Sequence, residues 1–146
     1  MKSLYIIDGY NVIRRIGTYR AKFNQSAEKG RDALVVQLAN WRHQSKCGIV
    51  VVFDGDSSSA VDSKSGVKII FSRSHQAADD VIKKLVDSDK SRFAITVVSS
   101  DTAVMRYAKG SGCGVMSSEA FHKKISTLRN AAVEQSTEKD DPQLSS

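Results

Sequence analysis

Three apolar runs in this sequence end at or just before an aspartate, and these aspartates are the residues best suited to chemistry. They are Asp8 after residues 4–7, Asp54 after residues 49–53, and Asp101 after residues 93–98. Uninterrupted apolar runs predict strands that are buried on both faces, as in a parallel sheet covered by helices. Open α/β sheets bind their ligands at the carboxyl ends of the strands. We therefore place Asp8 at the centre of a candidate active site.

A fourth aspartate stands in a predicted helix over residues 77–86, whose apolar positions recur at helical spacing. At about 100° per residue, Asp79 borders the apolar face of this helix, whereas Asp80 points away from it. We therefore expect Asp79 to reach over the sheet edge and Asp80 to cap the helix or pair with a surface lysine. Acids are also favoured in the first turn of any helix, and Asp101 is a good N-cap, so purely structural roles stay open.

Carboxylates gathered at one edge of a sheet repel one another unless a cation lies between them. Four carboxylates with no convergent His or Cys suit a hard ion, Mg²⁺ or Mn²⁺, rather than zinc. Such an ion makes hydroxide from bound water and neutralises charge on a phosphate under attack. Cys47 and Cys113 lack the spacing of metal ligands, so we expect free thiols in a reducing cytoplasm.

The segments between these aspartates predict the scaffold that positions them. A helix from about Ser26 to Lys46 joins the first two strands, which makes a right-handed βαβ unit with parallel strands. Residues 67–71 predict a third strand, at an edge of the sheet because it contains Lys68, and residues 115–116 predict a short last strand before a final helix. Five strands alternating with helices indicate an α/β fold, a three-layer α/β/α sandwich with a mainly parallel sheet.

Two further segments are predicted to lack regular structure. Residues 55–66 are small and polar without periodicity, so we expect a loop that borders the site and could close over substrate. Beyond about residue 132 the chain turns polar, which predicts one domain over residues 1–132 and a disordered tail over residues 133–146.

The charge of the chain indicates a polyanionic partner. Glu134 and the residues after it contain four acids and one lysine, so the net charge of +6 divides into −3 there and +9 on residues 1–133. A basic body of this kind favours nucleic acid. No apolar run approaches the roughly 20 residues that span a bilayer, and Lys2 is followed at once by the first strand without a signal peptide, so no membrane partner is expected.

Basic residues that follow the first strand are interleaved with two aromatic side chains, Tyr19 and Phe23. Such a mixture can bind phosphates and stack on unpaired bases, and it equally fits a solvated loop with two rings packed on the core. The candidate RNA-binding residues are Arg14, Arg15, Arg20 and Lys22.

Four short motifs carry a further inference. They are Asp8-Gly9-Tyr10-Asn11, Val52-Phe53-Asp54-Gly55, Ala78-Asp79-Asp80-Val81-Ile82 and Ser99-Ser100-Asp101. In this order, over roughly residues 3–130, they resemble the YacP-like NYN domain family of the PIN-like nuclease superfamily. The resemblance implies strand order 3-2-1-4-5 and a metal-dependent endoribonuclease that hydrolyses RNA phosphodiester bonds. It also implies that the metal is held by Asp8, Asp79 and Asp101, with Asp54 as a fourth ligand.

The resemblance implies roles for other residues as well. Asn11 would hydrogen-bond the scissile phosphate or a metal-bound water, and Gly9 would let the backbone turn tightly beneath the site. Arg31 matches a family position whose role the sequence does not give, and pairing with a site carboxylate is one hypothesis for it. Thr102 and Ala103 stand where some related nucleases have a second acid, which leaves the number of metal ions open.

RNA is the implied partner, either free or presented on a large assembly such as the ribosome, and no small-molecule cofactor is implied. The alternative function is an RNA-binding module of the same fold with weak or no catalytic activity, which would bind RNA and leave it intact with any divalent ion. A haloacid-dehalogenase-type phosphatase would need a second aspartate where Tyr10 stands. A response-regulator receiver would need an acidic pair at the end of the first strand and a lysine near the end of the last one, and the sequence has neither.

Overall fold

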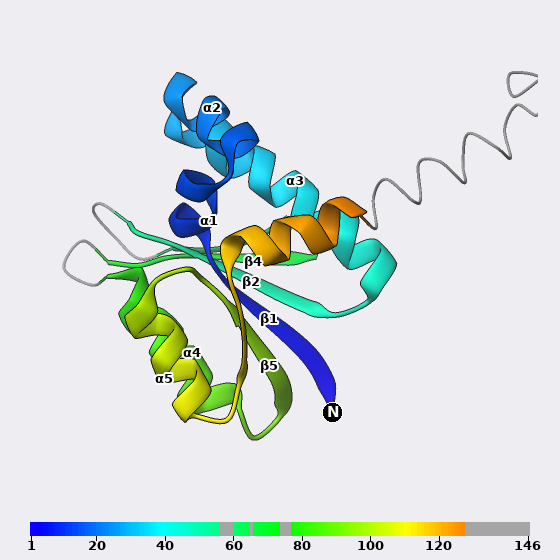
Figure 1. Ribbon diagram of the computed structural model, residues 1–146, viewed down its shortest axis with the longest axis vertical. Helices are drawn as coiled ribbons and strands as arrows, with labels where there is room; N and C mark the ends of the chain where they lie inside the picture. Colours follow the sequence, from blue (N-terminus) through cyan, green and yellow to red (C-terminus); the bar gives the residue numbers. More distant parts are fainter. Residues whose placement is uncertain (56–59, 65, 74–76, 128–146) are drawn as a thin grey trace, which may run out of the picture.

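One six-stranded sheet forms the centre of the protein, and helices lie on both of its faces (Figure 1). The computed structural model describes residues 1–55, 60–64, 66–73 and 77–127 of the chain. The strands are β1 (Lys2–Asp8), β2 (Gly48–Phe53), β3 (Ala60–Lys64), β4 (Val67–Phe71), β5 (Phe93–Val98) and β6 (Gly114–Met116). Their order across the sheet is β3-β4-β2-β1-β5-β6.

The central strand β1 pairs in parallel with β2 on one side and with β5 on the other. β4 and β6 extend the sheet, also in parallel. The predicted order of the five parallel strands is therefore confirmed. Asp8 lies in register with Val52, and Ile7 with Val98, so the carboxyl ends of β1, β2 and β5 meet at one edge of the sheet. We call this edge the carboxyl edge.

Strand β3 corrects the expectation of a polar loop over residues 55–66. It pairs antiparallel with β4, with Ala60 opposite Phe71 and Lys64 opposite Val67. β4 is therefore an inner strand, and its prediction as an edge strand was wrong. Strand pairing uses backbone groups, so a polar segment can join the side of a sheet without an apolar pattern in its sequence. Residues 56–59 and 65 lie outside the described residues, and so does the predicted tail over 133–146.

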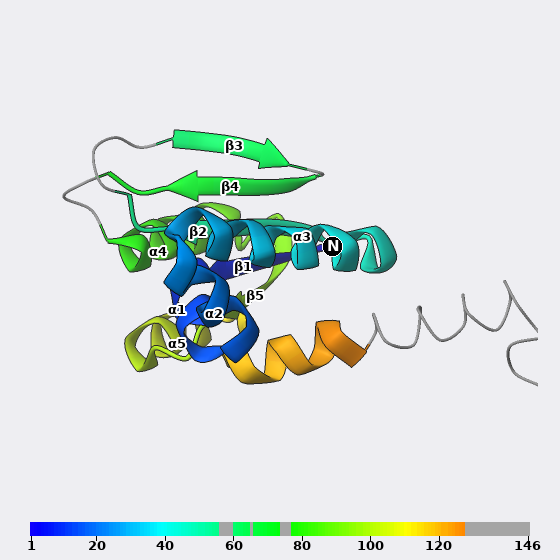
Figure 2. The same cartoon turned by 90° about the horizontal axis from the view of Figure 1, so that it is seen from above.

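The helices form the two outer layers. α1 (Gly9–Arg15), α2 (Gly17–Gln25) and α3 (Ala27–Ser45) lie on one face together with a helix over residues 118–127, and α4 (Ala78–Asp89) and α5 (Thr102–Gly110) lie on the other (Figures 1 and 2). Side chains of β1 alternate between these layers: Ile7 packs under α1 to α3, whereas Leu4 and Ile6 pack under α4 and α5. The three-layer α/β/α sandwich is therefore confirmed. Within the described residues, no helix is long and apolar enough to cross a membrane.

Helix α3 begins and ends where its sequence predicts. Oγ of Ser26 accepts a hydrogen bond of 3.1 Å from the N–H of Lys29, which makes Ser26 the N-cap. The helix ends at Lys46, whose φ of 58° is left-handed. The buried face carries the apolar side chains of Leu34, Leu38 and Trp41.

Helices α1 and α2 occupy a segment for which a solvated loop was one of the two alternatives that the sequence left open. Val12, Ile13 and Tyr19 are buried in the core of that layer. Short helices are marginal on their own, so tertiary packing rather than local propensity stabilises this pair. The thiols of Cys47 and Cys113 are free.

Candidate active site

Asp8 stands at the end of β1, where the chain turns directly into α1. The next residue, Gly9, passes so close to Phe53 on β2 that an added Cβ atom would lie 2.3 Å from Cε1 of the phenyl ring. A side chain has no room there, so only glycine allows the backbone after β1 to pass this close to β2. The carboxylate of Asp8 is thereby fixed, partly buried, at the carboxyl edge.

The buried hydroxyl of Ser99 connects two of the predicted site residues. Ser99 follows β5 directly, and its Oγ donates a hydrogen bond of 2.8 Å to Oδ2 of Asp8. The same oxygen accepts a hydrogen bond of 3.0 Å from the N–H of Asp101. Asp101 caps α5, because its Oδ1 accepts a hydrogen bond of 3.1 Å from the N–H of Val104. One serine therefore fixes Asp8 relative to Asp101.

The pKa of Asp8 is raised from 3.8 to about 6. Burial is the largest cause, because it disfavours the charged carboxylate. The hydrogen bond from Ser99 opposes this, the negative charges of Asp54 and Asp101 raise the pKa further, and the positive charge of Arg14 lowers it. Asp8 thus lies within electrostatic reach of Asp54 and of Asp101, and carboxylates that repel in this way are stabilised by a cation.

Asp54 joins β2 to the start of α4. Its Oδ1 accepts a hydrogen bond of 2.7 Å from the N–H of Ala78, the first residue of that helix. A negative charge is favourable at this position because it faces the positive end of the helix dipole. The next residue, Gly55, lies so close to the residue that follows β4 that an added Cβ atom would lie 1.9 Å from the backbone oxygen of Ser72. The position of Asp54 is therefore fixed by its hydrogen bond to α4 and by the close packing of Gly55 against Ser72.

Asp79 lies in the first turn of α4, beside the helix end that Asp54 caps. Its side chain is half-buried and its Oδ1 accepts a hydrogen bond of 3.0 Å from the N–H of Asp80, which is exposed. Among the described residues, the charges that shift the pKa of Asp8 do not include Asp79. The structure thus connects Asp8 electrostatically with Asp54 and with Asp101, whereas the described hydrogen bond of Asp79 stays within α4.

The donor chemistry at the carboxyl edge fits a hard divalent ion that is completed by water or substrate. In the part of the chain that the structure describes, no three His, Cys, Asp or Glu side chains are placed to hold a metal ion. Mg²⁺ commonly binds through one or two carboxylates and fills its remaining positions with water and substrate phosphate oxygens. Asp8 and its neighbouring carboxylates supply oxygen ligands of that kind.

Asn11 belongs to a hydrogen-bond network between distant parts of the chain. Its Oδ1 accepts hydrogen bonds from the N–H of Ser100 and from Oγ of Ser118, each 2.8 Å long. Oγ of Ser100 accepts a further hydrogen bond of 3.0 Å from the N–H of Ser118. The side-chain oxygen of Asn11 therefore joins the end of β5 to the helix over residues 118–127. Because this oxygen accepts two hydrogen bonds, a contact of Asn11 with phosphate would come from its Nδ2 group.

Sequence reasoning missed the roles of these serines. Ser99 and Ser100 stand between a buried strand and a helix cap, where polar groups must find hydrogen-bond partners, and that position was the available signal. Ser118 gave no comparable signal, since its partner Asn11 lies 107 positions away.

The four predicted RNA-binding residues have different surroundings. Arg14 is exposed at the end of α1 and acts electrostatically on Asp8. Arg15 forms an ion pair with Glu119 at the start of the last described helix. Nη1 of Arg20 donates a hydrogen bond of 3.1 Å to the backbone oxygen of Arg14. Arg14 is therefore the predicted cation most directly tied to the carboxylates.

The aromatic residues of this segment are core residues. Tyr19 is buried, and Phe23 is half-buried with its ring centroid 5.7 Å from that of Tyr10. The expected alternative, two rings packed on the core, is confirmed. Stacking of RNA bases on these two rings is not supported.

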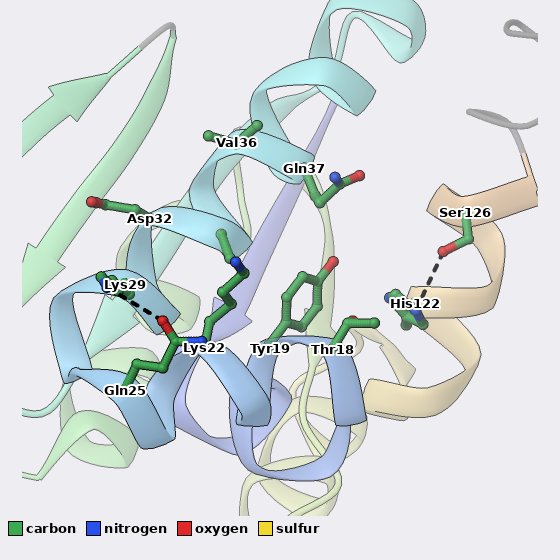
Figure 3. A pocket seen from close by; sticks show the side chains of 11 residues that line it. Thr18, Tyr19, Lys22, Gln25, Lys29, Asp32, Val36, Gln37, His122 and Ser126 are labelled. Carbon is green, nitrogen blue, oxygen red and sulfur yellow. Dashed lines mark hydrogen bonds between the residues drawn. The ribbon is translucent and has the colours of Figure 1, made fainter.

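Lys22 lines a groove of about 900 Å³ between α2, α3 and the helix over residues 118–127 (Figure 3). The rings of Tyr19 and His122 meet there edge to face, with centroids 5.3 Å apart. Burial lowers the pKa of His122, which favours the neutral form of its ring. None of the four predicted carboxylates lines this groove. It is therefore separate from the carboxyl edge.

Arg31 does not have the carboxylate partner that was expected. Its Nη1 donates a hydrogen bond of 3.0 Å to the hydroxyl of Tyr10, and its guanidinium lies over the ring of Phe71. Neither of the two ion pairs among the described residues includes it. The expected pairing of Arg31 is therefore corrected.

Known proteins with similar folds confirm the architecture. The crystal structure of Rae1 (YacP) from Bacillus subtilis has a TM-score of 0.79 at 23% identity, over 93% of this chain and 80% of that one. A tryptophan-to-leucine mutant of Rae1 (YacP) has a TM-score of 0.78 at 25% identity, over 90% of this chain and 79% of that one.

Sequence comparison gives the family. A Bacillus subtilis (strain 168) protein described as "Uncharacterized protein YacP" is 25% identical over 130 residues, which cover 86% of this chain and 76% of that protein. Residues 5–146 match the family model of the YacP-like NYN domain. NYN domains are part of the PIN-like nuclease superfamily, which gives the chain a nuclease-type, RNA-related role. The fold, the aspartates at its strand ends and this match agree that the chain belongs to the YacP-like NYN domain family.

Proposed function

We propose that this protein is a divalent-metal-dependent endoribonuclease that hydrolyses RNA phosphodiester bonds at the carboxyl edge. The observation that carries this proposal is the position of Asp8, which is partly buried at the carboxyl edge and is linked through Ser99 to Asp101 at the end of the neighbouring strand. The raised pKa of Asp8, caused by burial and by the charges of Asp54 and Asp101, agrees with this position. Strongly perturbed carboxylates cluster at functional sites, and α/β sheets bind ligands at this edge. Membership of the YacP-like NYN family supports the same reading.

In this proposal Asp8, Asp54, Asp79 and Asp101 hold Mg²⁺ or Mn²⁺. When bound, the ion supplies a water of lowered pKa and neutralises charge on the phosphate under attack. The chain itself orients these ligands, because Ser99 fixes Asp8 against the turn that leads to Asp101.

Two other side chains are proposed to contact the RNA at this edge. Asn11 presents its Nδ2 group to the scissile phosphate, because its Oδ1 is held by Ser100 and Ser118. Arg14 attracts the strand by its charge. Arg15 and Arg20 extend the basic surface beside Arg14, and Lys22 adds positive charge at the separate groove, which is consistent with the net charge of +6. We propose cytoplasmic RNA as the partner, either free or presented on the ribosome.

Cleavage assays on structured and unstructured RNA test this function. We expect cleavage with Mg²⁺ or Mn²⁺, none with EDTA, and none by Asp8→Asn with either ion. Asp87→Asn is the matched control, because Asp87 is an exposed acid on α4 whose contact is with the hydroxyl of Tyr107. Asp8→Asn that cleaves as well as the wild type in Mn²⁺ would refute the site.

The second candidate function is an RNA-binding module of the same fold with weak or no activity. One observation favours it: among the described residues, no three His, Cys, Asp or Glu side chains are placed to hold a metal ion. RNA that is bound and left intact with every divalent ion would establish this function and exclude the nuclease.

A further inference from the structure

Arg31 on α3 is held in one orientation by two aromatic side chains. The hydroxyl of Tyr10 accepts a hydrogen bond of 3.0 Å from its Nη1, and its Cζ lies 5.4 Å from the centroid of the Phe71 ring. The side chain is half-buried, and neither ion pair among the described residues involves it. A guanidinium carries five N–H donors in a planar fork, and within the described residues the hydrogen bond to Tyr10 uses one of them.

Both aromatic partners place this guanidinium at the carboxyl edge. Tyr10 follows Asp8 by two residues, and its ring centroid lies 5.0 Å from that of Phe53, which directly precedes Asp54. Phe71 is in register with Phe53 on the neighbouring strand, with ring centroids 5.5 Å apart. Arg31 therefore approaches the same ends of β2 and β4 that border the carboxylates.

A cavity of about 180 Å³ lies beside Arg31, between α3 and the sheet. Phe53, Ile69 and Phe71 form its apolar side. Glu28 and Asp32 also line it, but both are exposed, so water and salt screen their charges. The charge of the half-buried Arg31 is screened less than the charges of these two acids, and its orientation is set by Tyr10 and Phe71.

We propose that Arg31 binds a phosphate of the RNA strand next to the phosphate held at the carboxylates, and that Tyr10 and Phe71 orient it for this contact. Arginine matches phosphate in a bidentate way, with two parallel N–H···O bonds. A second fixed phosphate sets the position of the strand over Asp8. This inference rests on the proposed function for the identity of the polyanion as RNA.

The test measures binding of a single-stranded RNA oligonucleotide in EDTA, so that cleavage cannot interfere. Arg42→Met is the matched control for Arg31→Met. Arg42 is an exposed residue of the same helix, about 16 Å further along it and within about 20° of the same face, towards the opposite edge of the sheet.

We expect Arg31→Met to raise the Kd about tenfold and to reduce the slope of log K against log salt by about 0.7, as for one lost phosphate contact on a single strand. Arg31→Lys keeps the charge and should keep the slope with an intermediate Kd. Arg42→Met should bind as the wild type does. Unchanged Kd and slope in Arg31→Met, or an equal loss in Arg42→Met, would overturn the proposal.

Two further variants keep the proposal testable. Tyr10→Phe removes only the hydroxyl that orients Arg31, so it should raise the Kd two- to threefold even if Arg31→Met fails to fold; an unchanged Kd would count against the orienting role and overturn the proposal. Glu28→Gln should tighten binding, and a loss instead would mean that the cavity takes a base amine, not a phosphate.

The binding assay is independent of the proposed nuclease activity. A protein that never cleaves RNA but loses affinity in Arg31→Met contradicts the nuclease and supports this phosphate contact. A protein that cleaves RNA but binds equally well as Arg31→Met contradicts only this phosphate contact.

Discussion

Oγ of Ser99 lies 2.8 Å from Oδ2 of Asp8, and this hydrogen bond joins the carboxyl ends of two neighbouring strands, β1 and β5. The same oxygen also accepts a hydrogen bond from the N–H of Asp101, so a single buried hydroxyl bonds to both aspartates. Buried polar groups that lose their partners are costly, typically about 1–3 kcal/mol each. Substitution of Ser99 should therefore affect both Asp8 and Asp101.

Ser99→Ala should lower the free energy of unfolding by about 1–3 kcal/mol, because the N–H of Asp101 loses its acceptor. It should also raise the pKa of Asp8 above its present value, since the Ser99 hydrogen bond favours the charged carboxylate. Urea unfolding and NMR titration of the Asp8 carboxyl measure the two effects. Ser88→Ala, at an exposed serine of α4, should change neither.

Asp8→Asn should stabilise the metal-free protein in a pH-dependent way. The folded pKa of about 6 lies above the usual 3.8, so the folded state binds more protons than the unfolded state between these pH values, and stability falls as pH rises through that window. In EDTA the gain in unfolding free energy from Asp8→Asn should be near zero below pH 4 and on the order of 2–3 kcal/mol at pH 7. Urea unfolding at several pH values checks it; a gain that does not vary with pH would argue against the raised pKa of Asp8.

Gly9→Ala should destabilise the fold, because the added Cβ would lie 2.3 Å from the ring of Phe53. Overpacking of this kind typically costs about 1–3 kcal/mol. Gly110→Ala is the matched control, since its Cβ would meet no atom within 4 Å and alanine favours the helix. Thermal unfolding should show a lower Tm for the first variant and an equal or higher Tm for the second. Equal Tm values would show that the Phe53 ring moves aside at little cost.

Asn11→Asp and Asn11→Ala separate the structural and chemical roles of this residue. Aspartate keeps an oxygen for Ser100 and Ser118, so Asn11→Asp should retain most of the stability, whereas Asn11→Ala should lose about 1–3 kcal/mol. If Nδ2 contacts the phosphate, RNA cleavage should fall in both variants. Full cleavage by a stably folded Asn11→Asp would show that the amide nitrogen has no part in the reaction.

The sequence predicted the inner strands and the helix caps because the relevant signals are local. Buried parallel strands need uninterrupted apolar runs, and the N-cap roles of Ser26 and Asp101 follow from side-chain chemistry within three residues. These local rules also place Asp8 and Asp54 at one edge, since parallel strands share their direction. The family resemblance added the order of the strands.

The rest depended on partners that are distant in sequence. β3 forms by backbone hydrogen bonding to β4. α1 and α2 are stabilised because Val12, Ile13 and Tyr19 pack in the core. The contact of Arg31 with Tyr10 spans 21 positions and has no periodic signature. Long-range contacts of this kind leave no trace in a single sequence.

The network around Asn11 has a consequence for synthesis of the protein. Asn11 is among the first residues to be made, and Ser118 is near the end of the described chain, yet their side chains share a hydrogen bond. β1 likewise cannot complete its pairing until β5 has been made. A growing chain therefore carries an incomplete carboxyl edge, because Asp101 can join Asp8 and Asp54 only after β5 has been made.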